Sequence, residues 1–443
     1  MLRSPPPKNS KPSGTHRPNA GSRKLSFPRR LLIHFAVACA LTYGLEFWLH
    51  HVVEASGQSH NVLTQSLFGL ATFYHRLVTA IPRKPSPRFT TLITLSTKSS
   101  PPGVSLFNIC RERQFLGEAL KSLSHAQPSV VVIDKYFGAA TCPKDDPGTL
   151  NLIRGVQALC AGHTAVVVGR KVTDDALTGG GGITTYPLDQ SVMFAPAATC
   201  VTEGVTNIDL DLRRVVLWWP NVQPVLSSQG PPPSLALAAS LASSPALISN
   251  GRLSGWAPES PRPYVSFVER GQFDSHNVAA RDIVCGAGGD PGWRECQDDE
   301  LSQSVRGLVR GRVVVVGEDV ADYDRHETVV GDLPGYILQA NYIESLLDDR
   351  LIRPVPEVLN VLAGLMFFVA FEYVAWGYHH KRLNALKWIV ILVAGTGLII
   401  YLSVTLFGYY LNPATIGLLA VLLRLADMGL VPSREPRAGS IRR

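Results

Sequence analysis

Short runs of consecutive apolar residues recur through the middle of the chain. Such runs cover Thr91–Leu95, Val130–Ile133, Ala165–Val168 and Val313–Val316, and each is followed by a polar or turn-forming residue. Their length and their content of β-branched residues favour strands over helices. Because apolar residues occupy consecutive positions rather than alternate ones, we expect strands that are covered on both faces, as in a parallel sheet.

Helical periodicity fills the segments between these runs. It is seen at Arg111–Leu123, Leu150–Leu159, Leu235–Leu241 and Ile337–Leu347, and a further strand with a tryptophan pair is predicted at Arg213–Trp219. Alternation of strands and helices is typical of a parallel sheet with covering helices. Residues 89–356 are therefore predicted to form an α/β domain with a mixed, largely parallel sheet.

Four longer apolar segments have the length of a bilayer crossing. They cover residues 31–49, 358–378, 388–407 and 413–431, which gives one predicted transmembrane helix before the domain and three after it. Residues 61–81 form a predicted amphipathic helix, which we expect to pack against the domain rather than lie on the bilayer. A cleaved signal peptide is the alternative for the first span, and it leaves the placement of the domain unchanged.

The charge distribution orients these spans. The chain has 443 residues and a formal net charge of +7, and the basic excess lies in residues 1–30, in the loop between the second and third spans, and in residues 432–443. By the positive-inside rule both termini are cytoplasmic and residues 50–357 lie outside. Residues 1–30 are predicted to be disordered and attracted to membrane lipids. Nucleic-acid binding is not expected, since the domain itself carries no basic excess.

Cysteine usage agrees with an exported domain. Cys39 lies in the first span, and the other six lie in the exported region at Cys110, Cys142, Cys160, Cys200, Cys285 and Cys296. An even set outside the cytosol predicts disulfides, for which about 15 pairings exist. The favoured pair is Cys285 with Cys296, which would close a Gly- and Asp-rich loop. Metal ligation is the competing interpretation, but the sequence has no Cys-x-x-Cys pair.

Acidic residues follow two of the predicted strands, where ligands bind in parallel α/β sheets. One hypothesis is a ligand or cation pocket that contains Asp134, Asp319 and Asp324. The alternative is that Asp134 and Asp324 cap helices or hold loop backbone. Hydrolase and P-loop motifs are absent, and Gly179–Gly182 is interpreted as a flexible loop, so neither an enzyme nor a cofactor is expected.

Three charged residues lie inside the predicted spans. Glu372 is in the second span, and Arg424 and Asp427 are in the fourth. Glu372 and Arg424 lie at similar depth when counted from the outer face, so they are candidates for an interhelical ion pair. Snorkelling of each side chain to the inner interface is the open alternative.

A set of short motifs along the domain carries a family resemblance. These are Arg111, Asp134-Lys135-Tyr136-Phe137, Gly317, Asp324 with Thr328 four residues on, Pro334-Gly335, Ala340-Asn341 and Arg353-Pro354. In this arrangement the chain resembles the CHASE2 domains, the extracytoplasmic sensory modules of bacterial receptors. It departs from the family pattern at Ser96–Lys98, where an acid is usual, at Gln339, where a His is usual, and at Val329, where a Pro is usual.

The resemblance implies a multi-pass protein of the bacterial inner membrane that senses an extracytoplasmic ligand, with Thr328 joining the three aspartates as a candidate ligand-binding residue. Receptors of this family usually continue into a cytoplasmic kinase or cyclase, and here only residues 432–443 follow the last span. We therefore expect signalling through a separate protein partner, with homo-oligomer formation as an option. The competing class is an envelope scaffold, an accessory subunit of a membrane assembly.

Overall fold

The computed structural model describes residues 86–95, 109–135, 142–143, 145–171, 200–208, 214–219, 231–249, 262–286, 293–319, 324–328 and 330–355, with isolated positions between 359 and 410. The chain divides into two units, one of residues 1–55, 364–389 and 414–443 and the other of residues 56–363 and 390–413. The secondary-structure elements described below belong to the second unit.

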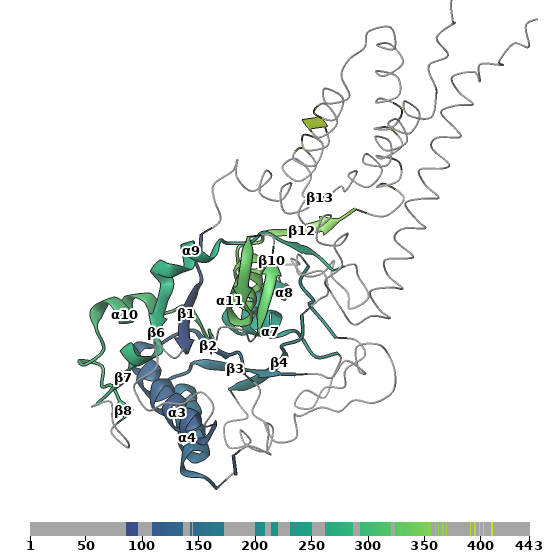
Figure 1. The fold of residues 1–443 in the computed structure, drawn as a ribbon. Helices are drawn as coiled ribbons and strands as arrows, with labels where there is room; N and C mark the ends of the chain where they lie inside the picture. The colour runs from purple at the N-terminus through teal and green to yellow at the C-terminus, as the bar shows by residue number, and fades with distance from the viewer. Residues whose placement is uncertain are drawn as a thin grey trace, which may run out of the picture. The chain divides into compact units, whose positions relative to one another are not determined.

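The core of this unit is a six-stranded sheet in the order β4-β3-β2-β9-β1-β6 (Figure 1). The strands are β1 (Thr90–Leu95), β2 (Val130–Ile133), β3 (Ala165–Arg170), β4 (Val201–Val205), β6 (Asn277–Ala279) and β9 (Val313–Glu318). Every neighbouring pair is parallel, and β9 lies between β2 and β1, with Val315 opposite both Val132 and Leu92. The predicted α/β fold with a largely parallel sheet is confirmed.

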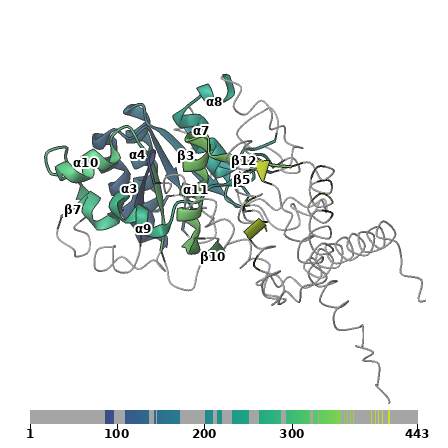
Figure 2. The same cartoon turned by 90° about the horizontal axis from the view of Figure 1, so that it is seen from above.

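Helices cover both faces of the sheet, as the view in Figure 2 shows. One face packs against α3 (Ile109–Ala126), α4 (Pro147–Ala161) and α10 (Gln303–Val309), and the other against α7 (Leu235–Ser243) and α11 (Gly335–Leu347). The side chains of β9 point alternately to the two faces of the sheet. Val314 and Val316 pack on the α3 side, whereas Val313 and Val315 pack on the α11 side. A strand that is covered on both faces is therefore rich in apolar residues on both of its faces.

Smaller elements surround the sheet. They are β5 (Tyr264–Val265), α8 (Ala246–Ser249), α9 (Arg270–Phe273), two 3₁₀ turns (Asp274–His276 and Ala280–Ile283), β7 (Val284–Cys285), β8 (Arg294–Glu295), β10 (Arg325–Thr328), β11 (Gly331–Pro334), β12 (Leu351–Pro354) and β13 (Tyr409–Tyr410). The strands β10 and β11 form an antiparallel hairpin directly before α11. The strand β12 follows α11 and pairs with β5 and β13.

The strand predicted at Arg213–Trp219 is wrong. Within the described part of this range, Arg214 and Trp218 make only isolated antiparallel bridges, to Tyr264 and Pro233. Val215, Leu217 and Trp219 are nevertheless buried, so their apolar character reflects packing against the α7 side rather than pairing in the sheet. Two sheet strands, β4 and β6, were not predicted, because β4 contains Thr and Glu and β6 has three residues.

Six of the cysteines form three disulfides. The pairs are Cys110–Cys142, Cys160–Cys200 and Cys285–Cys296, with Cα–Cα distances of 5.4, 5.6 and 5.0 Å. The prediction of disulfides is confirmed, and the favoured pairing of Cys285 with Cys296 is present.

In the portion of the chain that the structure describes, none of the helices combines the length and the apolar character needed to cross a bilayer. The predicted spans at 31–49 and 413–431, the amphipathic helix at 61–81 and the glycine run at 179–182 lie outside the described residues. The same holds for Glu372, Arg424 and Asp427. The spans at 358–378 and 388–407 are described only at isolated positions.

Candidate functional site

The carboxyl ends of the central strands bring two of the predicted aspartates to one edge of the sheet, here called the carboxyl edge. Asp134 follows β2, and its backbone N–H donates to Val316 of β9 at 2.9 Å. Asp319 follows β9, and its N–H donates to Leu95 of β1 at 2.9 Å. In parallel α/β sheets this edge is the usual place for a ligand.

Lys135 joins three elements at this edge. Its ammonium contacts the carboxylates of Glu112 from α3 and Glu318 from β9. Burial lowers the pKa of Lys135, and the contact with Glu112 opposes that change. The lysine therefore has two anionic partners within the protein, and the group carries one net negative charge when all three are ionised.

Asp319 is engaged by two arginines. One carboxylate oxygen accepts from Arg270 at 2.8 Å and the other accepts from Arg325 at 2.6 Å. Arg325 also faces Asp332 at 3.5 Å. A cation that bound Asp319 would have to displace guanidinium groups from both oxygens, so the arrangement gives Asp319 a structural role at the edge.

A buried hydroxyl chain lies beside these charges. The hydroxyl of Tyr336 in α11 lies 2.8 Å from the hydroxyl of Thr94 in β1, which in turn donates to the side-chain oxygen of Asn277 at 2.7 Å. Burial raises the pKa of Tyr336 to about 12, with nearby Asp319 adding to the effect. Tyr336 also touches Gly317, where an added Cβ would lie 2.1 Å from the tyrosine Cβ. The glycine therefore sets how closely α11 approaches β9.

Asp324 lies at the start of α11. Its backbone has φ of +51°, in the left-handed region, and its carbonyl accepts from the N–H of Gly335 at 2.9 Å. Its carboxylate lies against Gly335, because a Cβ at that position would be 2.1 Å from the Asp324 Oδ2. The other oxygen is 3.0 Å from His326 Nε2. A negative charge is favourable here because the N-terminus of a helix carries partial positive charge.

Thr328 holds the turn between β10 and β11. Its hydroxyl donates to the carbonyl of Gly331 at 2.6 Å and accepts from the N–H of Val330 at 3.3 Å. The side chain is buried. The structure therefore places Thr328 within the hairpin, where its hydroxyl is used for the turn.

Asp134 differs from its neighbours because its carboxyl group has no hydrogen-bond partner within the described ranges. The residue is half-buried. Burial raises the pKa of Asp134 to about 7; the charge of Asp324 adds to the rise and that of Lys135 opposes it. Of the four predicted ligand residues, the structure binds Asp319 to arginines, places Asp324 against the start of α11 and Thr328 in a turn, and leaves Asp134 at the end of β2, where the charge of Asp324 acts on it. The role of all four as ligand residues stays a prediction.

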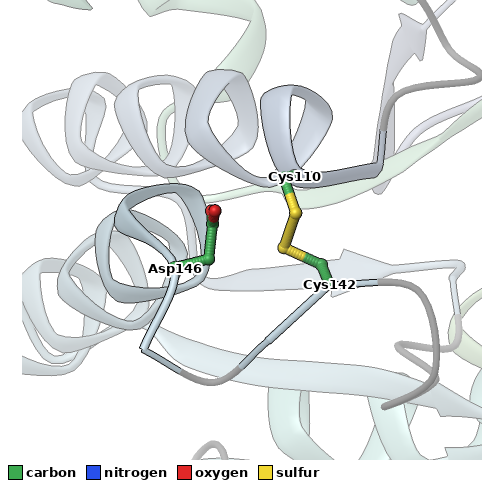
Figure 3. Close-up of side chains that lie close together, drawn as sticks. All are labelled: Cys110, Cys142 and Asp146. Carbon is green, nitrogen blue, oxygen red and sulfur yellow. A yellow bond between two sulfur atoms is a disulfide. The ribbon is translucent and has the colours of Figure 1, made fainter.

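A cluster of Cys110, Cys142 and Asp146 has the spacing of a metal site, since their candidate ligand atoms lie within 4.8 Å of one another (Figure 3). The two sulfurs form a disulfide, however, and metals bind cysteine as the thiolate. Asp146 accepts from the N–H of Gly148 at 2.7 Å and caps α4. The cluster is therefore a structural feature that ties the starts of α3 and α4 together.

The opposite edge of the sheet contains a carboxylate that the sequence analysis did not single out. Glu344 of α11 is fully buried, and one of its oxygens accepts from the backbone N–H groups of Phe89 at 2.8 Å and Thr90 at 2.7 Å and from the Thr90 hydroxyl at 2.8 Å. The N–H of Arg88 lies 3.0 Å from both oxygens. In the sequence, the sign of this site was that Glu344 is an acidic residue within an otherwise apolar helical pattern.

Two further charges complete this arrangement. Asp348 contacts the guanidinium of Arg88 at 3.1 Å and that of Arg350 at 2.9 Å, and Arg350 also approaches Glu344 at 3.9 Å. Arg88 to Thr90 lead into β1, the first strand of the sheet, and Arg350 directly precedes β12, which follows α11. We call this group, Arg88–Thr90 with Glu344, Asp348 and Arg350, the entry–exit junction. It is held at the end of α11 opposite to Asp324.

Comparison with known proteins identifies the family. A family model described as the CHASE2 domain matches residues 73–374, which is more than half of the 443 residues. Searches of curated proteins and of solved structures found no match. The matched range contains the whole parallel sheet, the carboxyl edge and the entry–exit junction. The chain therefore belongs to the CHASE2 domain family.

Proposed function

We propose that this protein is a receptor of the bacterial inner membrane, in which residues 89–356 perceive an extracytoplasmic signal and act on a separate protein partner. The observation that carries the proposal is the CHASE2 match over residues 73–374, since CHASE2 is a family of extracellular sensory domains. A sensory domain acts by changing the state of another domain or protein, so the proposal includes a partner such as a kinase or cyclase.

The geometry of α11 supports this proposal. Its first residue, Gly335, lies against Asp324 at the carboxyl edge, and its last turns carry Glu344 of the entry–exit junction. All 13 residues of α11 are buried. Because a closely packed helix moves as a unit, a change at its first turn is expected to alter the junction through which the chain enters and leaves the domain.

The proposed membrane placement has its own support. Leu359, Leu362, Met366 and Val369 are helical and have exposed side chains, at the spacing of one face of a helix. Exposed large apolar side chains at this spacing are expected of a helix that faces lipid. The three disulfides favour an oxidising compartment for residues 110–296. Both termini are accordingly proposed to be cytoplasmic.

Capture of the full chain from native membranes after mild crosslinking tests the receptor function. The expected result is recovery of a protein with an intracellular catalytic domain, whose output changes when Glu344→Gln replaces the wild type at equal abundance. The matched control is Asp298→Asn, an exposed carboxylate with a single long contact to Arg306. If the chain is instead recovered in fixed ratio with an envelope assembly, and Glu344→Gln changes no output, the result would support the alternative that the protein is an envelope scaffold.

Labelling of intact cells tests the placement. After mild reduction, Cys285 and Cys296 are expected to react with a thiol reagent that does not cross the inner membrane. Failure of both cysteines to react in intact cells, together with their reaction after lysis, would contradict a periplasmic domain.

A further inference from the structure

The strand β13 carries an inference about how the domain acts on the membrane. Its two residues, Tyr409 and Tyr410, lie in the short turn of residues 408–412 between the third and fourth predicted spans, yet they pair with β12, which precedes the second span. We propose that β13 is a noncovalent strap, by which the domain engages the last two spans as well as the span that follows it in sequence. The inference rests on the proposed receptor function and names the route by which its signal leaves the domain.

The strap is a backbone pairing in a defined register. Arg353 of β12 lies opposite Tyr409 of β13. Pro354 lies opposite Tyr410, and the two strands run parallel. On its other side β12 pairs with β5 in antiparallel orientation. The strand β12 is therefore the centre of a three-stranded sheet, here called the β12 sheet, and β13 is one of its edges.

The last turns of α11 hold the other two strands of the β12 sheet. The carbonyl of Ser266, directly after β5, accepts from the hydroxyl of Ser345 at 3.1 Å and from the guanidinium of Arg350 at 3.3 Å. Arg350 directly precedes β12, and its backbone N–H donates to the carbonyl of Ser345 at 2.9 Å. Further along the chain from β5, the N–H of Val268 donates to the side chain of Asn341 at 2.6 Å. A shift at the end of α11 is therefore expected to move β5 and β12 together.

The predicted topology places both partners of the strap on one side of the membrane. The strand β12 precedes the second span, and the turn of residues 408–412 joins two spans that cross in opposite directions, so the charge-based orientation puts both outside. In that arrangement β12 is linked covalently to the second span and by backbone pairing to the turn between the third and fourth. A displacement of β12 would therefore act on all three spans.

The short length of β13 suits a contact that opens and closes. Only two of its residues pair, at the edge of the sheet, and an edge with few hydrogen bonds opens at a small cost in free energy. The helix α11, by contrast, is buried along its whole length. A stimulus that shifts α11 therefore changes the population of paired β13 while the parallel sheet stays intact.

Engineered cysteines in native membranes test the pairing. Neighbouring strands lie about 4.8 Å apart, within the roughly 4.4–6.8 Å that separates the Cα atoms of a disulfide. The full chain carries Arg353→Cys with Tyr409→Cys, or Pro354→Cys with Tyr410→Cys. Cys39→Ser is added in each case, because Cys39 is the one native cysteine outside the three disulfides. We expect both pairs to cross-link in most of the chain on mild oxidation, as identified by mass spectrometry of the linked peptides.

The control is a pair that is out of register, Leu351→Cys with Tyr410→Cys. Leu351 lies three residues before Pro354, so at about 3.3 Å per residue it is roughly 10 Å from the position opposite Tyr410. This pair is expected to cross-link in a small minority of the chain. Absence of both in-register cross-links, or an equal yield in the control pair, would overturn the proposal.

Hydrogen exchange of the full chain in lipid nanodiscs tests whether a change at α11 reaches β13. Glu344→Gln removes a charge at the end of the helix, and we expect the amides of residues 351–353 and 409–410 to exchange several-fold faster than in the wild type. Asp298→Asn, at an exposed carboxylate, is expected to change neither segment. If Glu344→Gln does not fold, Ser345→Ala takes its place with the same expectation, because it removes the hydrogen bond to Ser266. Faster exchange at 351–353 with no change at 409–410 would contradict the strap.

Neither experiment needs a partner, so the strap and the proposed function can fail separately. In-register cross-links and transmitted exchange without any partner output in cells would contradict the receptor function and leave the strap standing. Partner output that changes in Glu344→Gln, in a protein without in-register cross-links, would overturn the strap alone.

Discussion

Two carboxylates at opposite edges of the sheet are in opposite situations. Glu344 at the entry–exit junction is fully buried and accepts hydrogen bonds from three backbone N–H groups and a hydroxyl. Asp134 at the carboxyl edge is half-buried and has no hydrogen-bond partner among the described residues. A buried carboxylate with many donors stabilises one conformation, whereas one without donors becomes sensitive to protonation. The comparison separates a structural acid from a responsive one within the same helix–sheet layer.

The largest effect is expected from removing the satisfied carboxylate. Glu344→Ala would leave the N–H groups of Phe89 and Thr90 and the Thr90 hydroxyl buried without an acceptor. We expect a loss of about 3–5 kcal/mol in the free energy of unfolding, measured by urea denaturation of the full chain in detergent. Asp298→Asn serves as the neutral control. If Glu344→Ala lost no more stability than Asp298→Asn, the donors of Phe89 and Thr90 would have found other acceptors.

Adding a side chain between β9 and α11 is expected to push the helix away from the sheet and to disturb both ends of α11. In Gly317→Ala the new Cβ would lie 2.1 Å from the Cβ of Tyr336, in a place without flexible atoms. Relieving this overlap requires α11 to shift, at a cost of about 2–3 kcal/mol. The melting temperature measures the effect, and Gly307→Ala, where the new Cβ would meet nothing within 4 Å beyond its own stretch of helix, is the matched control. Equal stability of the two variants would contradict the close approach.

Replacing Asp134 is expected to increase the stability of the protein at high pH but not at low pH. Because the pKa of Asp134 is raised from 3.8 to about 7, the folded state retains the proton that the unfolded state loses first. Stability from this group is fully present below about pH 4 and falls as the pH rises to about 7. Asp134→Asn removes this slope, so it should match the wild type at about pH 4 and exceed it by on the order of 2 kcal/mol at about pH 8.

Unfolding curves at several pH values check this prediction. Asp332→Asn is the comparison, since its carboxylate is exposed and in contact with Arg325. An Asp134→Asn curve parallel to that of the wild type at every pH would mean that Asp134 has an ordinary pKa, and the contrast with Glu344 would then disappear.

The smallest effect is expected in the hairpin. Thr328→Val removes the hydrogen bonds to Gly331 and Val330 and leaves the shape of the side chain. We expect a loss of about 1 kcal/mol, equal at all pH values, by thermal unfolding. Thr328→Ser, which keeps the hydroxyl, is the matched variant. A pH-dependent loss in Thr328→Val would show that the threonine hydroxyl interacts with a titrating group and does more than hold the turn.

The sheet could be predicted because its central strands are apolar at every position. Val130–Ile133 and Val313–Val316 are read correctly from sequence, and so are the helices that bury one continuous side. The edge strands β4 and β6 could not be found, since an edge needs fewer apolar residues and β4 contains Glu203. The loop around Val215 was mistaken for a strand because burial alone produces the same pattern.

The site could be predicted only in part. The positions of Asp134 and Asp319 follow from where their strands end. The pairing of Asp319 with Arg270 and Arg325 depends on residues distant in sequence, so spacing gives no hint of it. Some residues of the family motifs form hydrogen bonds that hold the fold together. Asn341, for example, is buried, accepts from the N–H of Val268 at 2.6 Å and donates to the carbonyl of Ile337 at 3.1 Å.

Covalent cross-links are distributed unevenly over the two faces of the sheet. All three disulfides lie on the face covered by α3 and α4, and the face covered by α7 and α11 has none. Mechanical stiffness is therefore concentrated on the α3 side, while α11 is held by packing and hydrogen bonds alone. The helix α11, which joins the two edges of the sheet, can therefore shift without breaking a covalent cross-link. The α3 side is held in place by its three disulfides.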